Sequence, residues 1–240
     1  MGKYSFTDDE LGDLIVSVRR GMRHVRSKIK DGTVELSIPP GLSVAELKHI
    51  IDANRTKLKK MLADSNSAKL RYYDGQTINC LDGYSVTIGK QSIIADKAIL
   101  SNDEKNFYIN IPQKISFEDD SATGFISACL KSTARRIAPL VVPGLAQKVA
   151  ADVCAKPAGF VIGSGLRKLG HCTRTGVIQL SYNMVFLPEH LARFIILHEI
   201  THLTHFNHSP EFHSLLDYYC NGKEKSLNAE LKQFHWPVKL

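Results

Sequence analysis

Apolar and polar residues alternate near the start of the chain in the pattern of a half-buried strand. Val34, Leu36 and Ile38 are separated by single polar residues, and a period of two is typical of a strand with one buried face. Asp31-Gly32 directly before them is a turn signal, so we expect a hairpin whose first strand covers about residues 24–30. Two prolines and a glycine then end the second strand.

A helix is expected after this hairpin. Ser43 is followed three residues later by Glu46, and this spacing forms a capping box at the start of a helix. The apolar positions of the helix are Leu47, Ile50, Ile51, Leu58 and Met61. The polar residues 64–67, Asp-Ser-Asn-Ser, then predict a linker.

Between residues 72 and 117 the pattern is again that of β-structure. Short runs with strand character cover residues 84–88, 92–100 and 107–111. The pairs Asp74-Gly75, Asp82-Gly83 and Asn102-Asp103 punctuate this stretch as turn signals. A β-rich segment is therefore predicted here.

The chain after residue 119 is expected to be mainly helical. One helix should run over about residues 120–138, and Pro139 or Pro143 should break or kink it before another helix reaches Ala155. Two short strands are predicted near residues 160–162 and 176–182.

The next predicted helix begins near Pro188, because proline is well tolerated in a first helical turn. It should end around Asn207. Ser209-Pro210-Glu211 then starts a further helix with a cap residue, a proline and an acidic side chain in the first turn. These patterns predict an α+β protein in three parts, residues 1–65, 66–118 and 119–240.

The composition is that of an ordinary globular protein, with 43% hydrophobic and 23% charged residues in a chain of 240. No apolar run approaches the roughly 18 residues that span a bilayer, so no membrane partner is expected. Residues 1–13 are acidic and lack the apolar core of a signal peptide. Five scattered cysteines without a C-x-x-C pair predict free thiols and a cytoplasmic location.

The formal net charge is +7. A basic surface could attract nucleic acid, an anionic membrane or an acidic protein. Lysine and arginine are spread along the whole chain, which favours an ordinary solvated surface. The cluster Arg19, Arg20, Arg23, Arg26, Lys28 and Lys30 could bind nucleic acid. The last three alternate, however, as the solvent face of a strand would.

His198-Glu199-Ile200-Thr201-His202 is an H-E-x-x-H motif. Positions i and i+4 share one face of a helix, so both imidazoles can reach one tetrahedral metal ion. Glu199 lies about 100° further round the helix and can approach the open position of the metal without binding it. A zinc-bound water has a pKa lowered toward about 7, so this carboxylate can accept its proton.

The surroundings of the motif favour metal binding over chance. Apolar residues at 194–197, with Leu203 and Phe206, predict a helix that is buried on nearly every face. Two histidines and a glutamate on such a helix would be costly unless they bind something.

A catalytic zinc of this type needs a third protein ligand. His208 is the preferred candidate, because the turn before Ser209-Pro210 can bring its ring back toward the metal, and its offset of ten from His198 matches the H-E-x-x-H-x-x-G-x-x-H pattern. Glu211 and Asp217 are the carboxylate alternatives. His205 and His213 are interpreted as packing residues or as residues that support the ligands.

Cys172 beside His171 could suggest a second metal site or a cysteine nucleophile. One such pair without a partner pair at ligand spacing is usually structural, and that interpretation is favoured.

The chain resembles the YgjP-like metallopeptidases, a group related to the SprT and WLM zinc proteases. The resemblance covers most of the sequence. It is carried by His198-Glu199-x-x-His202 with Asn207-His208-Ser209 and Phe212, by Leu169-Gly170-His171-Cys172 with residues 176–180, and by residues 20–39. Leu169 stands where the family usually has tryptophan, His171 where a small residue is common, and His213 where an aromatic residue is frequent.

This resemblance implies a zincin-like fold, with Zn²⁺ held by His198, His202 and His208 and with Glu199 as the catalytic residue. It further implies that the strand before the helix, residues 176–182, binds an extended peptide by edge pairing. Glu199 would deprotonate water and pass the proton to the leaving amine. The group that stabilises the oxyanion is left open among Arg167, His171, Tyr182 and Tyr218.

Two alternatives to a zinc peptidase remain open. The first is a zinc-stabilised, non-catalytic module that binds protein or DNA, as suggested by the SprT relationship and the basic charge. The second is a metal-dependent hydrolase that acts on something other than a peptide, because H-E-x-x-H indicates the metal and the base but not the acyl group. The sequence does not predict an oligomeric state.

Overall fold

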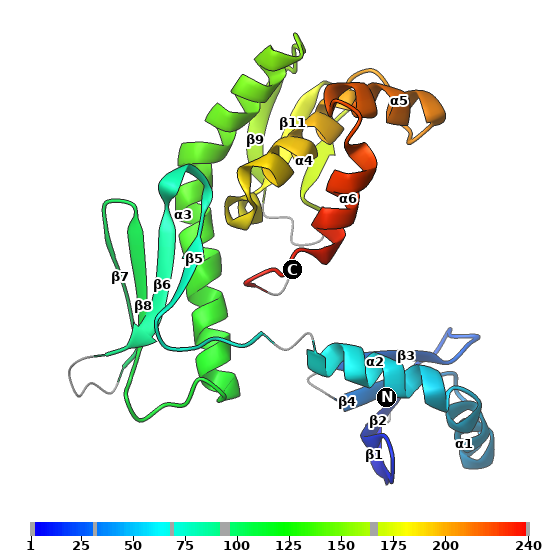
Figure 1. Cartoon of the computed structure of the whole chain (residues 1–240). Helices are drawn as coiled ribbons and strands as arrows, with labels where there is room; N and C mark the ends of the chain where they lie inside the picture. Colours follow the sequence, from blue (N-terminus) through cyan, green and yellow to red (C-terminus); the bar gives the residue numbers. More distant parts are fainter. Residues whose placement is uncertain (1–2, 31–32, 68–69, 92–96, 164–167, 239–240) are drawn as a thin grey trace. The chain divides into compact units, whose positions relative to one another are not determined.

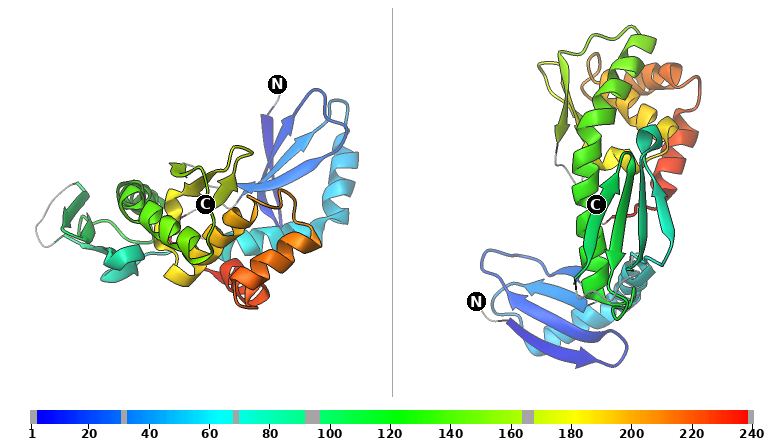
Figure 2. Two further views of the ribbon diagram at one scale, coloured as in Figure 1. Left: turned by 90° about the horizontal axis from the view of Figure 1, so that it is seen from above. Right: turned by 90° about the vertical axis from the view of Figure 1, so that its left-hand side faces the viewer.

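The computed structural model describes residues 3–30, 33–67, 70–91, 97–163 and 168–238. The chain divides into two compact units, residues 1–69 and 70–240, each with its own hydrophobic core. The sequence-based division at residues 65 and 118 remains a prediction. Figure 1 labels the elements of both units, and Figure 2 shows further views.

The first unit is a four-stranded sheet in the order β1-β2-β4-β3. Its strands are β1 (Lys3–Asp8), β2 (Gly12–Val18), β3 (Arg26–Lys30) and β4 (Thr33–Ile38). The expected pairing of β3 with β4 is present, while the turn Asp31-Gly32 lies outside the described residues. Strands β1 and β2 were not predicted, and the latter pairs in parallel with β4.

One face of this sheet is covered by helices α1 (Val44–Ala53) and α2 (Arg55–Ser67). The capping box is confirmed, since the Ser43 hydroxyl accepts from the Glu46 N–H and the Glu46 carboxylate accepts from the Ser43 N–H. The single predicted helix is in fact two, which meet at Asn54. The expected linker at residues 64–67 is wrong, because α2 continues to Ser67. The core that these elements enclose consists of Leu11, Leu14, Val16, Val34, Leu36, Ile38, Leu47, Ile51 and Leu58.

The second unit contains two sheets that share one core with a long helix. The first sheet has the order β5-β6-β8-β7, from β5 (Gln76–Asn79), β6 (Ser85–Lys90), β7 (Ile99–Asp103) and β8 (Asn106–Ile111). A short 3₁₀ turn, η1 (Leu81–Gly83), links β5 to β6. The predicted run 92–100 falls partly outside the described residues. Asn102-Asp103 belongs to β7 rather than to a turn.

Helix α3 (Asp120–Asp152) is continuous through Pro139 and Pro143, so the expected break there is wrong. Each proline removes one N–H from the helical ladder. Pro139 is exposed, and the neighbouring Ile137, Ala138 and Val142 are completely buried. Tertiary burial of the opposite face therefore outweighs the missing hydrogen bonds.

The second sheet has the order β10-β11-β9, from β9 (Gly159–Gly163), β10 (Gly170–Cys172) and β11 (Val177–Ser181). The strand expected at residues 176–182 is thus present as β11. Its expected role as a sheet edge is wrong, because β11 pairs with β10 on one side and with β9 on the other. The sequence contains a local strand signal but not the order of the strands.

The chain ends in helical structure: η2 (Tyr182–Phe186), α4 (Glu189–Thr201), α5 (Pro210–Tyr219) and α6 (Glu224–Gln233). The α+β class is therefore confirmed. Within the part of the chain that the structure describes, no helix has both the length and the apolar character needed to cross a membrane.

Candidate metal centre

Helix α4 supplies the rigid base of the site. Pro188 is its N-cap and Glu189 lies in the first turn, as the sequence predicted for a helix start. Its buried residues point in nearly every direction and are Leu191, Ala192, Phe194, Ile195, Ile196, Leu197, Glu199, Ile200 and Thr201. His198 and Glu199 in its last turn are therefore fixed by packing on both sides.

The helix ends at Thr201 and not around Asn207 as expected. His202 is the C-cap, and its Nδ1 is 2.9 Å from the backbone carbonyl oxygen of His205. The Leu203 N–H donates to the Ile200 carbonyl, which tightens the last turn. The chain therefore reverses soon after the second histidine and returns toward the helix before α5 begins.

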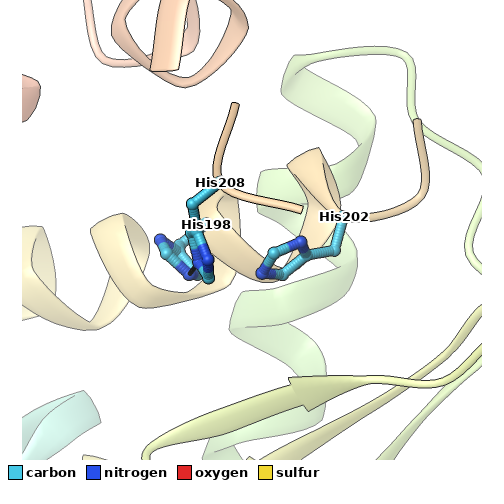
Figure 3. Close-up of side chains that lie close together, drawn as sticks. All are labelled: His198, His202 and His208. Carbon is cyan, nitrogen blue, oxygen red and sulfur yellow. Dashed lines mark hydrogen bonds between the residues drawn. The ribbon is translucent and has the colours of Figure 1, made fainter. Parts of the chain in front are cut away.

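This reversal brings three histidines together. Ring nitrogens of His198, His202 and His208 all lie within 4.8 Å of one another. The Nε2 atoms of His198 and His208 are 3.1 Å apart. Figure 3 shows the three rings converging, two from the end of α4 and the third from the segment that leads to α5.

Phe212 on α5 packs against all three of these rings. Its centroid is 5.0 Å from that of His198, 4.6 Å from that of His202 and 4.8 Å from that of His208. The side chain is completely buried. It therefore restricts the orientations of the imidazoles from the side of α5.

The surroundings favour the neutral form of the two imidazoles on α4, those of His198 and His202. Burial, followed by the proximity of His202, His208 and His213, lowers the pKa of His198 to about 4. Burial also lowers the pKa of His202, although its hydrogen bond to the His205 carbonyl opposes this. Neutral imidazole is the form that binds a metal ion.

Glu199 lies next to the histidines and is 6% exposed. Burial raises the pKa of its carboxyl group to about 7, while a backbone hydrogen bond from Cys172 and the charge of Lys168 act in the opposite direction. A carboxylate with a pKa near neutrality is suited to accept and return protons at physiological pH.

The donor set can accommodate a divalent metal ion. Three imidazoles with converging nitrogens are the ligands of many catalytic zinc sites. The hydrogen bond from the His202 Nδ1 to the His205 carbonyl leaves the Nε2 lone pair of His202 free, which is the usual arrangement around a metal-binding histidine.

The alternative ligands lie outside this cluster. Glu211 is exposed and accepts from the Ser209 hydroxyl at 2.6 Å. Asp217 accepts from the Glu224 N–H at 3.0 Å. The Nδ1 atom of His213 is 2.6 Å from a carboxylate oxygen of Glu224, and His205 contributes its backbone carbonyl to His202. The structure therefore brings only His208, of these candidates, into the group with His198 and His202 among the described residues.

The four candidates for oxyanion stabilisation differ in their positions. Arg167 lies outside the described residues. Tyr182 is 2% exposed, and its ring is 4.9 Å from the Arg135 guanidinium carbon on α3. Tyr218 is 76% exposed on α5. His171 on β10 is near enough to contribute to the lowered pKa of His202.

Cys172 is an unfavourable nucleophile in this structure. The residue is 8% exposed, and burial together with the charge of Glu199 raises the pKa of its thiol. A thiol kept protonated reacts slowly. The structural interpretation of this cysteine is therefore favoured.

Gly170 is a site residue to which the sequence assigned no role. A Cβ atom at this position would lie 2.5 Å from Cγ and Oε1 of Glu199. The only sequence signal was its place in the Leu-Gly-His-Cys segment that carries part of the family resemblance.

The chain matches the family described as YgjP-like, metallopeptidase domain, over residues 23–234. This match covers both units in large part and includes the three histidines and Glu199. No curated protein matches the chain. No solved structure matches it either.

Proposed function

The chain belongs to the YgjP-like metallopeptidase family, and we propose that it is a zinc-dependent peptidase with a zincin-like catalytic region. Membership supports a metal-dependent hydrolase. The observation that carries the finer proposal is the convergence of three histidine nitrogens beside one buried glutamate.

In this proposal His198, His202 and His208 hold the Zn²⁺ ion. When bound, the metal supplies Lewis acidity to the scissile carbonyl and to a water molecule. Glu199 accepts a proton from the attacking water on its carboxylate. As the C–N bond breaks, the same carboxyl group delivers that proton to the leaving amine nitrogen. The raised pKa of Glu199 supports both transfers near neutral pH.

A peptide substrate needs a binding surface beside these residues. Of the two edges of the β10-β11-β9 sheet, β10 packs against α4. An extended peptide that added to this edge, at backbone groups other than the Cys172 N–H next to Glu199, would be bound mainly through its backbone, with little demand on its sequence.

Metal analysis tests the ligand set. Purified protein should contain about one zinc per chain, and His208→Ala should lose it or bind it much more weakly. The control is His190→Ala, which removes an exposed histidine of α4 that pairs with Glu230 at 2.7 Å. Full zinc retention in His208→Ala would show that Glu211 or Asp217 is the third zinc ligand. Absence of any transition metal after zinc is supplied would contradict the proposal.

The Glu199→Gln variant separates an enzyme from a binding module. Hydrolysis of a peptide library should be lost while folding and zinc content persist, because the amide cannot accept the proton. Glu189→Gln on the exposed first turn of α4 is the matched control. Persistent hydrolysis in Glu199→Gln would show that another group is the base. Small amides, tested beside peptides, distinguish a peptidase from another metal-dependent hydrolase.

One observation favours DNA association as a second candidate function. Residues 19–30 contain six cations and no acidic residue, and all six cations are exposed. Only Lys28 forms an ion pair with another described residue, Glu35, at 2.7 Å. By strand alternation, Arg26, Lys28 and Lys30 lie on the face of the first sheet opposite to α1 and α2.

Salt-dependent binding tests this second candidate. Changing Arg19, Arg20 and Arg23 to glutamine should weaken the retention of duplex DNA and reduce its dependence on salt concentration. Changing Lys48, Lys57 and Lys60, which are exposed on α1 and α2, to glutamine removes the same number of positive charges and is the control for total charge. Equal effects of both sets of changes would contradict a DNA-binding surface at residues 19–30.

A further inference from the structure

The edge strand β10 lies against the carboxylate that the proposed mechanism needs. A Cβ atom at Gly170 would lie 2.5 Å from Cγ, 2.5 Å from Oε1 and 2.7 Å from Cδ of Glu199. Gly170 is not among the glycines with positive φ. The position therefore requires glycine for space and not for an unusual backbone conformation.

The backbone of β10 supplies a second contact. Leu169 accepts from the Ser181 N–H at 2.8 Å, and Thr173 donates to the Val177 carbonyl at 2.9 Å. In an antiparallel ladder these bonds alternate, so the polar backbone groups of Gly170 and Cys172 face away from β11 toward the open edge. The Cys172 backbone is near enough to the Glu199 carboxylate to lower the pKa of that group, against the larger effect of burial.

We propose that β10 positions Glu199, with Gly170 providing the room for its side chain and the Cys172 N–H holding its carboxylate. This inference rests on the proposed peptidase function for its catalytic meaning, although its geometry is independent of that function. One of these features is a backbone N–H, that of Cys172, and the other is the space left by the missing side chain of Gly170. The histidine cluster on α4 and before α5 is formed without them.

Hydrogen exchange of the Cys172 amide tests the contact directly. An N–H at an open strand edge exchanges readily unless something accepts from it. In Glu199→Ala the Cys172 amide should exchange about tenfold faster, the effect of losing one hydrogen bond. Glu189→Ala should leave its rate unchanged. An unaltered rate in Glu199→Ala would overturn the proposal, whether or not the protein is an active peptidase.

Gly170→Ala tests the space requirement. The added methyl group should displace the carboxylate and lower kcat for a fluorogenic peptide by about 10²-fold, with little change in KM and with zinc content retained. Gly159→Ala is the matched control. Gly159 lies on β9 of the same sheet, and a Cβ at this position meets no atom within 4 Å. Wild-type kcat in Gly170→Ala would overturn the space requirement. If the wild-type protein hydrolyses no peptide, the proposed function fails, and the exchange experiment still decides whether β10 holds Glu199.

Discussion

His202 leaves the regular helix just where its ring must reach the other two histidines. It is the C-cap of α4, and its Nδ1 contacts the His205 carbonyl. The contact fixes the ring and at the same time begins the turn that returns the chain toward His208. One local hydrogen bond therefore connects the end of the helix with the assembly of the site.

Phe212 should matter both for stability and for metal affinity. Phe212→Ala removes a completely buried ring that contacts all three histidines. We expect the free energy of unfolding of the metal-free protein to fall by about 3–5 kcal/mol. Zinc affinity, measured by competition with a chelator, should fall as well because the imidazoles gain freedom. Phe206→Ala, at a side chain 59% exposed, is the control. Unchanged zinc affinity in Phe212→Ala would show that the ring only fills space.

The histidines of the site could be predicted from sequence, whereas Gly170 could not. His198 and His202 are connected by helical periodicity, and His208 by a short turn, so the sequence spacing alone makes them candidates for one cluster. Gly170 meets Glu199 across the fold, between a strand and a helix that no local pattern pairs. A glycine in an edge strand has no sequence signal for a close approach of this kind.

The elements of the fold were easier to predict at their beginnings than at their ends. The capping box at Ser43 was predicted because it is formed by neighbouring residues. The end of α4 was misplaced because it depends on the hydrogen bond of His202 after the helix. The central position of β11 was missed because strand order is set by long-range pairing. Helix α3 was divided at its prolines because the burial of its opposite face is a tertiary effect.

The continuity of α3 predicts that one of its prolines can be replaced with a gain in stability. Pro139→Ala restores an N–H donor for the Arg135 carbonyl in an existing helix. A proline in a helix interior costs about 3 kcal/mol, and its rigidity in the unfolded chain offsets part of this. We expect the free energy of unfolding in urea to rise by about 1–2 kcal/mol. Pro40→Ala in an exposed turn should show no such gain, and an equal or lower stability of Pro139→Ala would contradict this account.

At the scale of the whole molecule, each unit has its own means of stabilisation. The first unit joins its β1-β2 turn to α2 through Arg55, which contacts Asp8 at 2.8 Å and Glu10 at 3.0 Å. The Arg55 side chain lowers the pKa of Asp8 from 3.8 to about 2. The second unit places the histidines and Glu199 around a separate core.

The lowered pKa of Asp8 predicts acid sensitivity of the first unit. Between pH 4 and pH 2 the unfolded chain binds more protons at this position than the folded one, since its pKa of 3.8 exceeds the folded value of about 2. The stabilisation of the folded unit by ionised Asp8 is complete above about pH 4 and is lost as the pH falls through about 2. We expect it to be about 1 kcal/mol after solvent screening, measured through methyl resonances of Leu14 and Val16 in urea titrations. Asp8→Asn should remove this pH dependence and Asp9→Asn should retain it.

The separate cores predict that metal binding belongs to the second unit alone. A chain of residues 70–240 retains α3, both sheets and α4 to α6, together with the three histidines, Glu199 and Phe212. It should therefore fold cooperatively and bind about one zinc ion, with an affinity equal to that of the full chain in chelator competition. Residues 1–69 alone should bind none in this range. Loss of zinc binding from a folded 70–240 chain would contradict this division. The family match begins at residue 23, so comparing peptide hydrolysis by the two chains then measures what the first unit adds to the reaction.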